Sequence, residues 1–328
     1  MRAWRVHQLG DPAEVLVVDD IPAPQPGPGE VLVDVAACGL NFPDILMCQG
    51  KYQERPPLPF TPGLETSGRI SAVGPGVDPA RKGSRVIALP APGSGGLAEQ
   101  MVAKEAATFP IPESLDDPSA AAMHITYQTS WFALHRRAAI RPGEWLLVHA
   151  AAGGVGSAAV QLGLAARARV IATAGGPEKV EVCRQLGAEV VIDYKADDFV
   201  ELVKEVTDGH GADVIYDPVG GDTFDRSRKV IAWEGRLLVI GFAGGRIPEV
   251  PANHILLKNY SVVGLHWAQY SRRDPSLVVA CHEELMRLHG TGAVKPLVFA
   301  TLPFDDTPKG LTLLGGRDTY GKVVVTPR

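Results

Sequence analysis

Residues 150–156, Ala-Ala-Ala-Gly-Gly-Val-Gly, have the composition of a loop that binds an anionic ligand. An apolar run at 145–148 precedes this loop, and apolar side chains at helical spacing follow it, which predicts a strand, a tight turn and a helix. The start of such a helix presents free N–H groups and the positive end of the helix dipole, which suit a pyrophosphate. Gly153, Gly154 and Gly156 leave room for that ligand. A tight turn that binds nothing would have the same composition.

Alternating strands and helices follow this turn and favour the ligand-binding interpretation. The expected helices cover 177–186, 197–206 and 223–232, and the expected strands cover 145–148, 169–173, 189–193, 213–217, 236–241 and 260–265. Such alternation predicts right-handed β-α-β units on a parallel sheet. Six strands suit a doubly wound domain that binds an adenine dinucleotide.

The end of the second expected strand indicates which dinucleotide binds. NAD sites usually carry an acid there, whereas this chain has Thr-Ala-Gly-Gly-Pro-Glu-Lys at 173–179. Gly175 leaves room, and Lys179 is close enough in sequence to meet a 2′-phosphate, so we expect NADPH, with NADH as the less favoured cofactor. Two alternatives stay open. Lys179 pairs with Glu178 or Glu181 in solvent, or Glu178 binds the ribose and favours NADH.

The first 120 residues have a different pattern. They are rich in proline and glycine, with short strands expected at 31–36, 66–73 and 84–89, which predicts a β-rich, partly open barrel. After residue 265, a helix at 275–288 leads to short strands that resemble this first part. We therefore expect an α/β protein in which a dinucleotide-binding domain, 123–266, is inserted into a β-rich domain formed by 1–122 and 267–328.

The bulk composition limits the classes of partner. The net charge of −5 gives no reason to expect nucleic acid as an obligate partner. The four cysteines are scattered without a C-x-x-C motif, which favours reduced thiols in a cytoplasmic protein. The N-terminus lacks the apolar core of a signal peptide, and the glycines and polar residues within 145–166 argue against a membrane span.

Five motifs in order give the chain a specific resemblance over essentially its full length. They are Gly39–Asp44, Pro62–Gly68, His149–Gly156, Val191–Tyr194 and Tyr216–Gly220. With them the chain resembles the zinc-independent quinone oxidoreductase (zeta-crystallin-like) branch of the medium-chain dehydrogenase/reductase superfamily. The resemblance implies a Rossmann-type domain inserted into a GroES-like catalytic domain.

Comparison with the zinc-bearing members of that superfamily predicts that this chain has no metal site. Those enzymes carry a catalytic Cys at the position of Asn41, a His at that of Leu64, and a third ligand near Ala122. Zinc needs three protein ligands with nitrogen, sulfur or oxygen donors in a catalytic site, and leucine and alanine have no such donor. The four-cysteine lobe of those relatives is also missing.

The resemblance implies hydride transfer from NADPH to a quinone or an α,β-unsaturated carbonyl. It implies three catalytic positions: Asn41 as a hydrogen-bond donor beside the nicotinamide, Tyr52 in the substrate cleft or as a proton donor, and Thr126 at the nicotinamide end. Related enzymes often carry Tyr where this chain has Leu46, so this chain lacks a phenol at that position to deliver a proton. The implied cofactor contacts are Asn41, Thr126, Gly153, Gly154, Val155, Gly156, Thr173, Gly175, Lys179, Tyr194, Gly241, Phe242 and Arg317.

Each catalytic position has a simpler structural interpretation. Asn41 would cap a helix or turn, Tyr52 would be a surface aromatic, and Thr126 would start a helix. We expect Asp44 to hold local structure. The histidines at 124, 149 and 266 lack metal-ligand spacing and a nucleophile, so we expect them to be structural.

The sequence leaves three functions open. The first is an NADPH-dependent quinone reductase, the second a reductase of enones or enoyl thioesters, and the third a cofactor-binding interaction protein with little turnover. The last expected strand, 260–265, is apolar and lies at the edge of its sheet. Because an unpaired apolar edge promotes association, we expect a homodimer that pairs these strands.

Overall fold

Two compact units make up the protein. The computed structural model describes residues 1–53 and 55–327. One unit contains Met1–Ile125 and Pro296–Arg328, and the other contains Thr126–Lys295. The chain thus returns to the first unit at residue 296, later than the expected 267. No helix in the described part of the chain is long and apolar enough to cross a bilayer.

The later return has a physical cause in the packing of residues 267–290. The Trp267 indole donates a hydrogen bond to Gln128 Oε1 at 3.1 Å, and the amide of Gln128 donates to Val278 O at 3.1 Å. The rings of Phe132 and Tyr270 pack with their centroids 4.2 Å apart. These contacts hold the segment against the helices that begin the second unit.

The second unit is a six-stranded parallel sheet in the order β10-β9-β8-β11-β12-β13. Its strands are β8 Trp145–Val148, β9 Arg169–Ala174, β10 Val190–Asp193, β11 Ala212–Asp217, β12 Ile231–Val239 and β13 Ser261–Gly264. Its helices are α4 His124–Trp131, which starts in the first unit, α5 Gly154–Ala165, α6 Pro177–Gln185, α7 Phe199–Val206, α8 Gly221–Ser227, α9 Ala252–Lys258, α10 Ala268–Arg273 and α11 Pro275–Gly290, with a π-helical turn at Phe132–Arg137. The strand order reverses between β8 and β11, which confirms the doubly wound domain.

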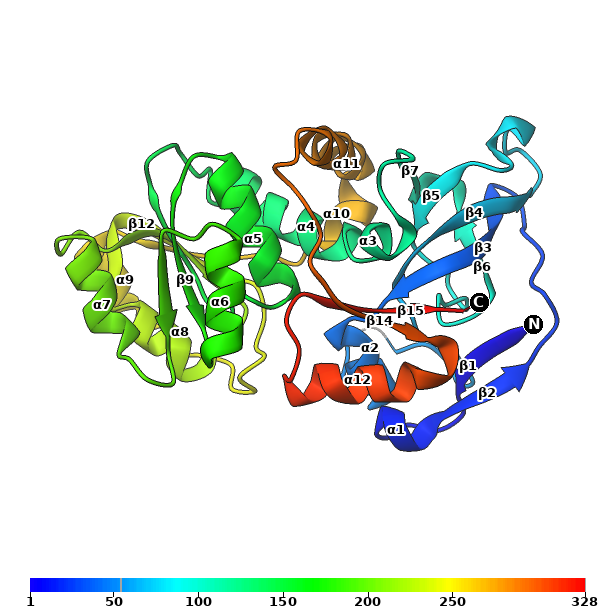
Figure 1. Ribbon diagram of the computed structural model, residues 1–328, viewed down its shortest axis with the longest axis horizontal. Coiled ribbons are helices and arrows are strands. Elements are labelled where there is room, and N and C mark those ends of the chain that lie inside the picture. Colours follow the sequence, from blue (N-terminus) through cyan, green and yellow to red (C-terminus); the bar gives the residue numbers. More distant parts are fainter. Residues whose placement is uncertain (54, 328) are drawn as a thin grey trace. The chain divides into compact units, whose positions relative to one another are not determined.

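Helices cover both faces of this sheet. Figure 1 shows α5 and α6 on one face and α7, α8 and α9 on the other. Side chains of β8 alternate accordingly. Leu147 packs in one apolar cluster with Phe199 of α7 and Phe224 of α8, whereas Leu146 points at Gly163 of α5. Because Gly163 has no side chain, α5 packs closely on β8, and its first turn is held at the end of that strand.

The first unit is built mainly from one seven-stranded sheet. The order is β14-β15-β3-β4-β5-β7, with β6 also paired to β3, and β1 and β2 form a separate hairpin-like pair. The strands are β1 Arg2–Val6, β2 Leu16–Asp20, β3 Glu30–Gly39, β4 Glu65–Val73, β5 Arg85–Ala88, β6 Gln100–Lys104, β7 Thr108–Pro110, β14 Val298–Pro303 and β15 Lys322–Thr326. The helices are α1 Pro12–Val15, α2 Phe42–Cys48, α3 Asp117–Ala121 and α12 Thr307–Gly316, with 3₁₀ turns at Pro79–Arg81, Glu105–Ala107 and Phe304–Asp306. This is the β-rich domain expected from the sequence.

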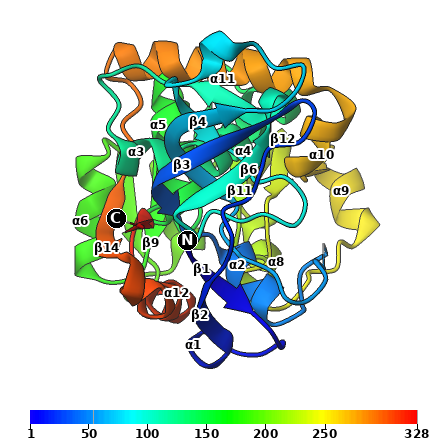
Figure 2. The same ribbon diagram turned by 90° about the vertical axis from the view of Figure 1, so that its right-hand side faces the viewer.

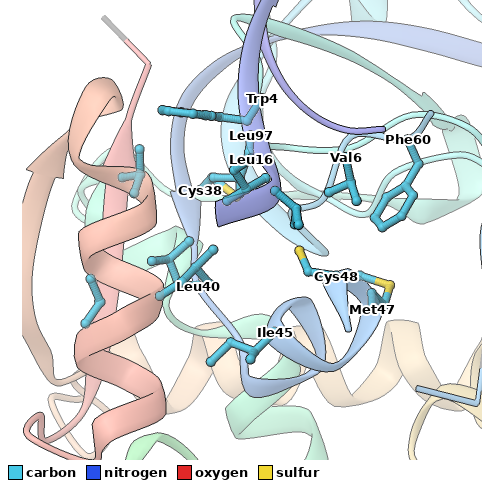
Figure 3. Close-up of a cluster of buried hydrophobic side chains, with 14 of the residues drawn as sticks. Trp4, Val6, Leu16, Cys38, Leu40, Ile45, Met47, Cys48, Phe60 and Leu97 are labelled. Atoms are coloured by element: carbon cyan, nitrogen blue, oxygen red, sulfur yellow. The ribbon is translucent and has the colours of Figure 1, made fainter. Parts of the chain in front are cut away.

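Helix α2 is fixed in place by one apolar cluster of the first unit. Figure 3 shows Cys38 from β3, Leu40 just after that strand, and Ile45, Met47 and Cys48 from α2 within this cluster. Helix α12 packs on α1 and α2, and Figures 1 and 2 both show it beside α1. The junction between β3 and α2, where Asn41 lies, is therefore held from two sides.

Two local expectations differ from the structure. The helix expected at 223–232 ends at Ser227, because the buried residues Ile231 and Ala232 already belong to β12, where Ile231 pairs with Ala212 of β11. Helix α12 was not expected from the sequence pattern, since Pro308 and three glycines weaken its helical periodicity.

Candidate active site

A buried lysine lies at the centre of a polar cluster at the start of α2. The Lys322 ammonium donates to Leu40 O at 2.8 Å, to Asn41 Oδ1 at 2.7 Å and to Glu65 Oε1 at 2.7 Å. The side chain of Lys322 is 6% exposed and that of Glu65 is fully buried. The other Glu65 oxygen accepts the N–H of Ile125 at 2.8 Å. All three ammonium hydrogens and both carboxylate oxygens are therefore used inside the unit.

Asn41 has its whole carboxamide engaged in this cluster. Its Nδ2 donates to Gly39 O at 3.0 Å and to Glu65 Oε1 at 3.1 Å, while its Oδ1 accepts from Lys322. An amide NH₂ has two hydrogens, so none is left for the oxygen of a substrate. In this arrangement Asn41 shapes the site through its position, and the expected donation to an acceptor oxygen would require a hydrogen bond to break.

Sequence reasoning missed Lys322 and gave Glu65 no role. Two signals could have identified them. Lys322 opens the apolar strand Lys-Val-Val-Val-Thr, and Glu65 follows Gly63-Leu64 at the start of β4. A charged residue in a strand with buried neighbours needs a partner of opposite charge, because burying an isolated ion is costly.

Asp44 has the structural role expected from the sequence. Its Oδ2 accepts the N–H of Asn41 at 2.8 Å and its Oδ1 accepts the N–H of Gly63 at 3.0 Å, so it joins the start of α2 to the segment before β4. Asp44 is fully buried. Burial raises the pKa of Asp44 to about 6, although both backbone hydrogen bonds act in the opposite direction.

Asp44→Asn is expected to destabilise the protein by about 1–3 kcal/mol at neutral pH, since asparagine cannot accept both backbone hydrogen bonds with oxygen atoms. The loss should depend on pH. The folded-state pKa of Asp44 lies above the ordinary value of an aspartate, so the stabilising proton is present at low pH and is lost as pH rises through about 6. We expect the difference in Tm between wild type and D44N to shrink from pH 4 to pH 6 and then to stay constant. A difference that widens over this range would contradict the assignment.

The other expected residues of the first unit lie in separate loops. Tyr52 follows α2 and is half-buried against the apolar cluster shown in Figure 3. Arg317 ends α12 in the left-handed conformation, with φ of 61°. Thr126 belongs to the second unit, where it is buried in α4.

The glycine turn has the geometry of an anion site. Helix α5 is 12 residues long and begins at Gly154, with Gly153 as its extended N-cap. A Cβ on Gly156 would overlap the backbone oxygen of Ala150, so only glycine fits there. The first N–H groups of the helix, at Gly154, Val155 and Gly156, have no intrahelical acceptor. They are free to bind phosphate oxygens at the reversal of strand order.

His149 holds this turn to its neighbours. Its Nε2 lies 2.8 Å from Ser227 Oγ and its Nδ1 lies 3.0 Å from Thr173 Oγ1. Because Ser227 donates its hydrogen to Thr223 O, it must accept from Nε2–H, and Nδ1 then accepts from Thr173. Burial lowers the pKa of His149 to about 3, so the ring is neutral at physiological pH. The hydroxyl of Thr173, an expected cofactor contact, is thus engaged with His149.

A buried carboxylate oxygen lies at the end of β11. Asp217 Oδ1 accepts the N–H groups of Val219 at 2.8 Å and Gly220 at 2.9 Å, whereas its Oδ2 has no partner within the described residues. Burial raises the pKa of Asp217. Next to it, the N–H of Ala243 donates to Pro218 O at 3.0 Å. This bond fixes the loop that carries the expected cofactor residues Gly241 and Phe242, and Phe242 is 42% exposed.

The loops that follow β9 and β10 meet side by side. Ala174 pairs with Asp193, and Tyr194 N–H donates to Ala174 O at 3.1 Å. A Cβ on Gly175 would lie 2.5 Å from the Tyr194 hydroxyl, so the phenol occupies the space that a side chain would need. Lys179 lies in the first turn of α6, which begins at Pro177. Gly175 and Tyr194 are therefore in contact, and Lys179 lies in the helix that follows Gly175.

The cluster around Asn41 does not fit a zinc ion. Within residues 1–53 and 55–327, no group of three or more His, Cys, Asp or Glu side chains is placed to hold a metal. The Lys322 ammonium contacts both Asn41 and Glu65, and Leu64 and Ala122 carry no donor atom.

Comparisons with known proteins agree with this architecture. Residues 27–113 match the model of the alcohol dehydrogenase GroES-like domain, and residues 154–281 match the model of the zinc-binding dehydrogenase family. The chain is 40% identical over 328 residues to quinone oxidoreductase-like protein 2 homolog of Nematostella vectensis, covering 100% of this chain and 89% of that one. It is 38% identical to quinone oxidoreductase-like protein 2 of Mus musculus, covering 99% and 93%.

A solved structure extends the likeness to the whole fold. Escherichia coli quinone oxidoreductase complexed with NADPH is 30% identical, with a TM-score of 0.92 and 100% coverage of both chains. Two relatives are 40% and 38% identical over nearly the full length of this chain, and two domain models match it. Together they lead to one conclusion. This chain belongs to the quinone oxidoreductase (zeta-crystallin-like) branch of the medium-chain dehydrogenase/reductase superfamily.

Proposed function

We propose that this protein transfers a hydride from NADPH to a quinone without a metal ion. The glycine turn at the start of α5 is the observation that carries the proposal, because it presents free N–H groups where the strand order reverses. The related Escherichia coli protein, a quinone oxidoreductase whose structure was solved in complex with NADPH, supports both cofactor and acceptor. Asp217 lies near that reversal, and its Oδ2 has no hydrogen-bond partner among the described residues. This also fits a site where a ligand donates hydrogen bonds.

Most of the residues proposed to hold the cofactor lie in the second unit. In the second unit, Gly153, Gly154, Val155 and Gly156 would bind the pyrophosphate, while Gly175, Lys179 and Tyr194 would bind the 2′-phosphate. Thr173 would act by positioning through His149. Thr126, Gly241 and Phe242 would border the nicotinamide, and Asn41 and Arg317 complete the set. When bound, NADPH supplies the hydride.

The chain's own side chains then have to position the acceptor and handle its proton. Lys322 and Glu65 keep the Asn41 carboxamide in one orientation, so that the surface beside it stays fixed. Tyr52 is the proposed proton donor at the reduced oxygen, since a phenol can donate directly or through water. The Lys322 ammonium contacts Asn41 Oδ1, at the position where the zinc-bearing relatives carry a catalytic Cys. This contact supports a reaction without zinc.

The experiment is an NADPH oxidation assay on protein dialysed against EDTA, with para-benzoquinone, methyl vinyl ketone and a crotonyl thioester as acceptors. We expect turnover with the quinone that added zinc does not increase. Preference for the enone or the thioester would favour the alternative reductase. Tight NADPH binding without turnover on any acceptor would favour an interaction protein, and turnover restored only by zinc would refute the proposal.

We also propose that the protein is a cytoplasmic homodimer joined through β13. This strand pairs with β12 on one side and, among the described residues, with no strand on the other. Exposed apolar side chains precede it, with Ile247 68% exposed, Leu256 75% and Leu257 71%. An apolar edge strand that follows exposed apolar side chains favours pairing with a second copy. The free, buried cysteines are compatible with a reducing compartment.

Leu257→Glu is expected to convert the dimer into a monomer, because a carboxylate in a buried apolar contact lacks a partner. Sedimentation velocity at micromolar concentration measures the change. Val279→Glu, at another exposed apolar position of the second unit, is the control and should leave the dimer intact. A wild-type protein that sediments as a monomer would contradict the proposed interface.

A further inference from the structure

A second lysine accompanies Tyr194 at the loop after β9. The hypothetical Cβ on Gly175 would lie 3.2 Å from Lys195 Cε, as well as 2.5 Å from the Tyr194 hydroxyl. The aliphatic stem of Lys195 therefore lies over Gly175 beside the phenol. Two consecutive residues after β10 thus use the space that the absent side chain of Gly175 leaves open.

Asp193 fixes the backbone of both loops. Its Oδ1 accepts the N–H of Gly176 at 3.0 Å and that of Lys195 at 3.0 Å, so one oxygen ties the turn after β9 to the turn after β10. These hydrogen bonds, with that of Gly176 first, lower the pKa of Asp193, and the charge of Lys195 acts in the same direction. The carboxylate is therefore ionised at neutral pH, and the start of the Lys195 side chain is held in one place.

The charged end of Lys195 remains available. Its ammonium makes no hydrogen bond or salt bridge to any residue within 1–53 and 55–327, in contrast to Lys204, which is 2.8 Å from Glu201 in the same unit. The Lys195 side chain is exposed. Its aliphatic part lies against Gly175, whereas its ammonium has no hydrogen-bond or salt-bridge partner among the described residues. A cation in this state suits a multiply charged anion that arrives with a ligand.

We infer that Lys195 is a specificity-determining residue that binds the 2′-phosphate of NADPH together with Lys179 and Tyr194. The inference rests on the proposed function. A 2′-phosphate carries close to two negative charges, so two ammonium groups and a phenol would neutralise it and donate hydrogen bonds. A cofactor that ends in a 2′-hydroxyl offers no such charge, and Lys195 should not affect its binding.

The experiment compares Lys195→Met with wild type by calorimetric titration of 2′,5′-ADP and 5′-AMP, which differ in the 2′-phosphate. We expect the Kd for 2′,5′-ADP to rise about tenfold while the Kd for 5′-AMP stays unchanged. The same split should appear as a higher KM for NADPH with an unchanged KM for NADH. Lys195→Arg should restore most of the affinity, because it restores the cation.

Lys204→Met is the matched control, since it removes a lysine of the same unit that already has an acidic partner. It should leave both dissociation constants unchanged. If Lys195→Met binds 2′,5′-ADP as tightly as wild type does while NADPH still supports turnover, the role of Lys195 is wrong and the proposed function stands. If wild type binds neither 2′,5′-ADP nor NADPH, the proposed cofactor fails, and this inference fails with it.

Discussion

Replacing Lys322 with methionine is expected to lower the free energy of unfolding by about 3–5 kcal/mol, the usual cost of breaking a buried ion pair from one side. The substitution leaves the fully buried Glu65 carboxylate without its cation. It also leaves Leu40 O and Asn41 Oδ1 without the donor that each has at 2.8 Å and 2.7 Å. The Asn41 carboxamide would keep only its two Nδ2 hydrogen bonds and would be held less firmly, so activity should fall together with stability.

Differential scanning calorimetry of three variants tests this expectation. Lys322→Met with Glu65→Gln should lose less stability than Lys322→Met alone, because the double variant buries no unpaired charge. Lys309→Met is the control, since the Lys309 side chain is 65% exposed and lies 3.8 Å from Asp306, and it should change stability by less than about 0.5 kcal/mol. If Lys322→Met lowers stability by as little as this control does, the cluster of Lys322, Glu65 and Asn41 does not stabilise the site.

Gly156→Ala is expected to weaken NADPH binding by about 100-fold. The new Cβ would overlap Ala150 O and lie 2.8 Å from Ala151 Cα, and both are backbone atoms that no side-chain rotation can clear. The turn must therefore move, and its N–H groups lose their alignment on the phosphates. Each hydrogen bond to a charged group contributes about 1.5–3 kcal/mol, so the loss of one or two accounts for a change of this size.

Fluorescence titration with NADPH measures the affinity, and far-UV circular dichroism checks that the variant is folded. Gly290→Ala is the matched control, because a Cβ there meets nothing within 4 Å at the end of α11, and it should bind NADPH as wild type does. A folded Gly156→Ala variant with wild-type affinity would show that the cofactor does not lie on this turn.

Features that depend on neighbouring residues could be predicted from the sequence. The apolar run at 145–148, the glycines and the helical spacing after them are local signals, and the structure places β8, the turn and α5 where they predict. The same holds for the alternation that builds the six-stranded sheet. Periodicity and backbone sterics act over a few residues, so they can be read without knowing the fold.

Features that depend on distant residues were missed or only partly assigned. The boundary at 296 depends on how Gln128 binds Val278, which is 150 residues further along the chain. Thr173 was expected to contact the cofactor, but its hydroxyl donates a hydrogen bond to His149 Nδ1. Lys195 looks like an ordinary surface lysine in the sequence, and only the pairing of β9 with β10 brings its stem to Gly175.

Contiguous residues were enough to predict the two kinds of domain, the glycine turn before α5 and the family resemblance. The role of Asn41, in contrast, could be assigned only from the folded chain. Its partner Lys322 lies 281 residues away, and Glu65 lies 24 residues away. The strength of this cluster comes from burial, which removes competing water from charges that no sequence pattern brings together.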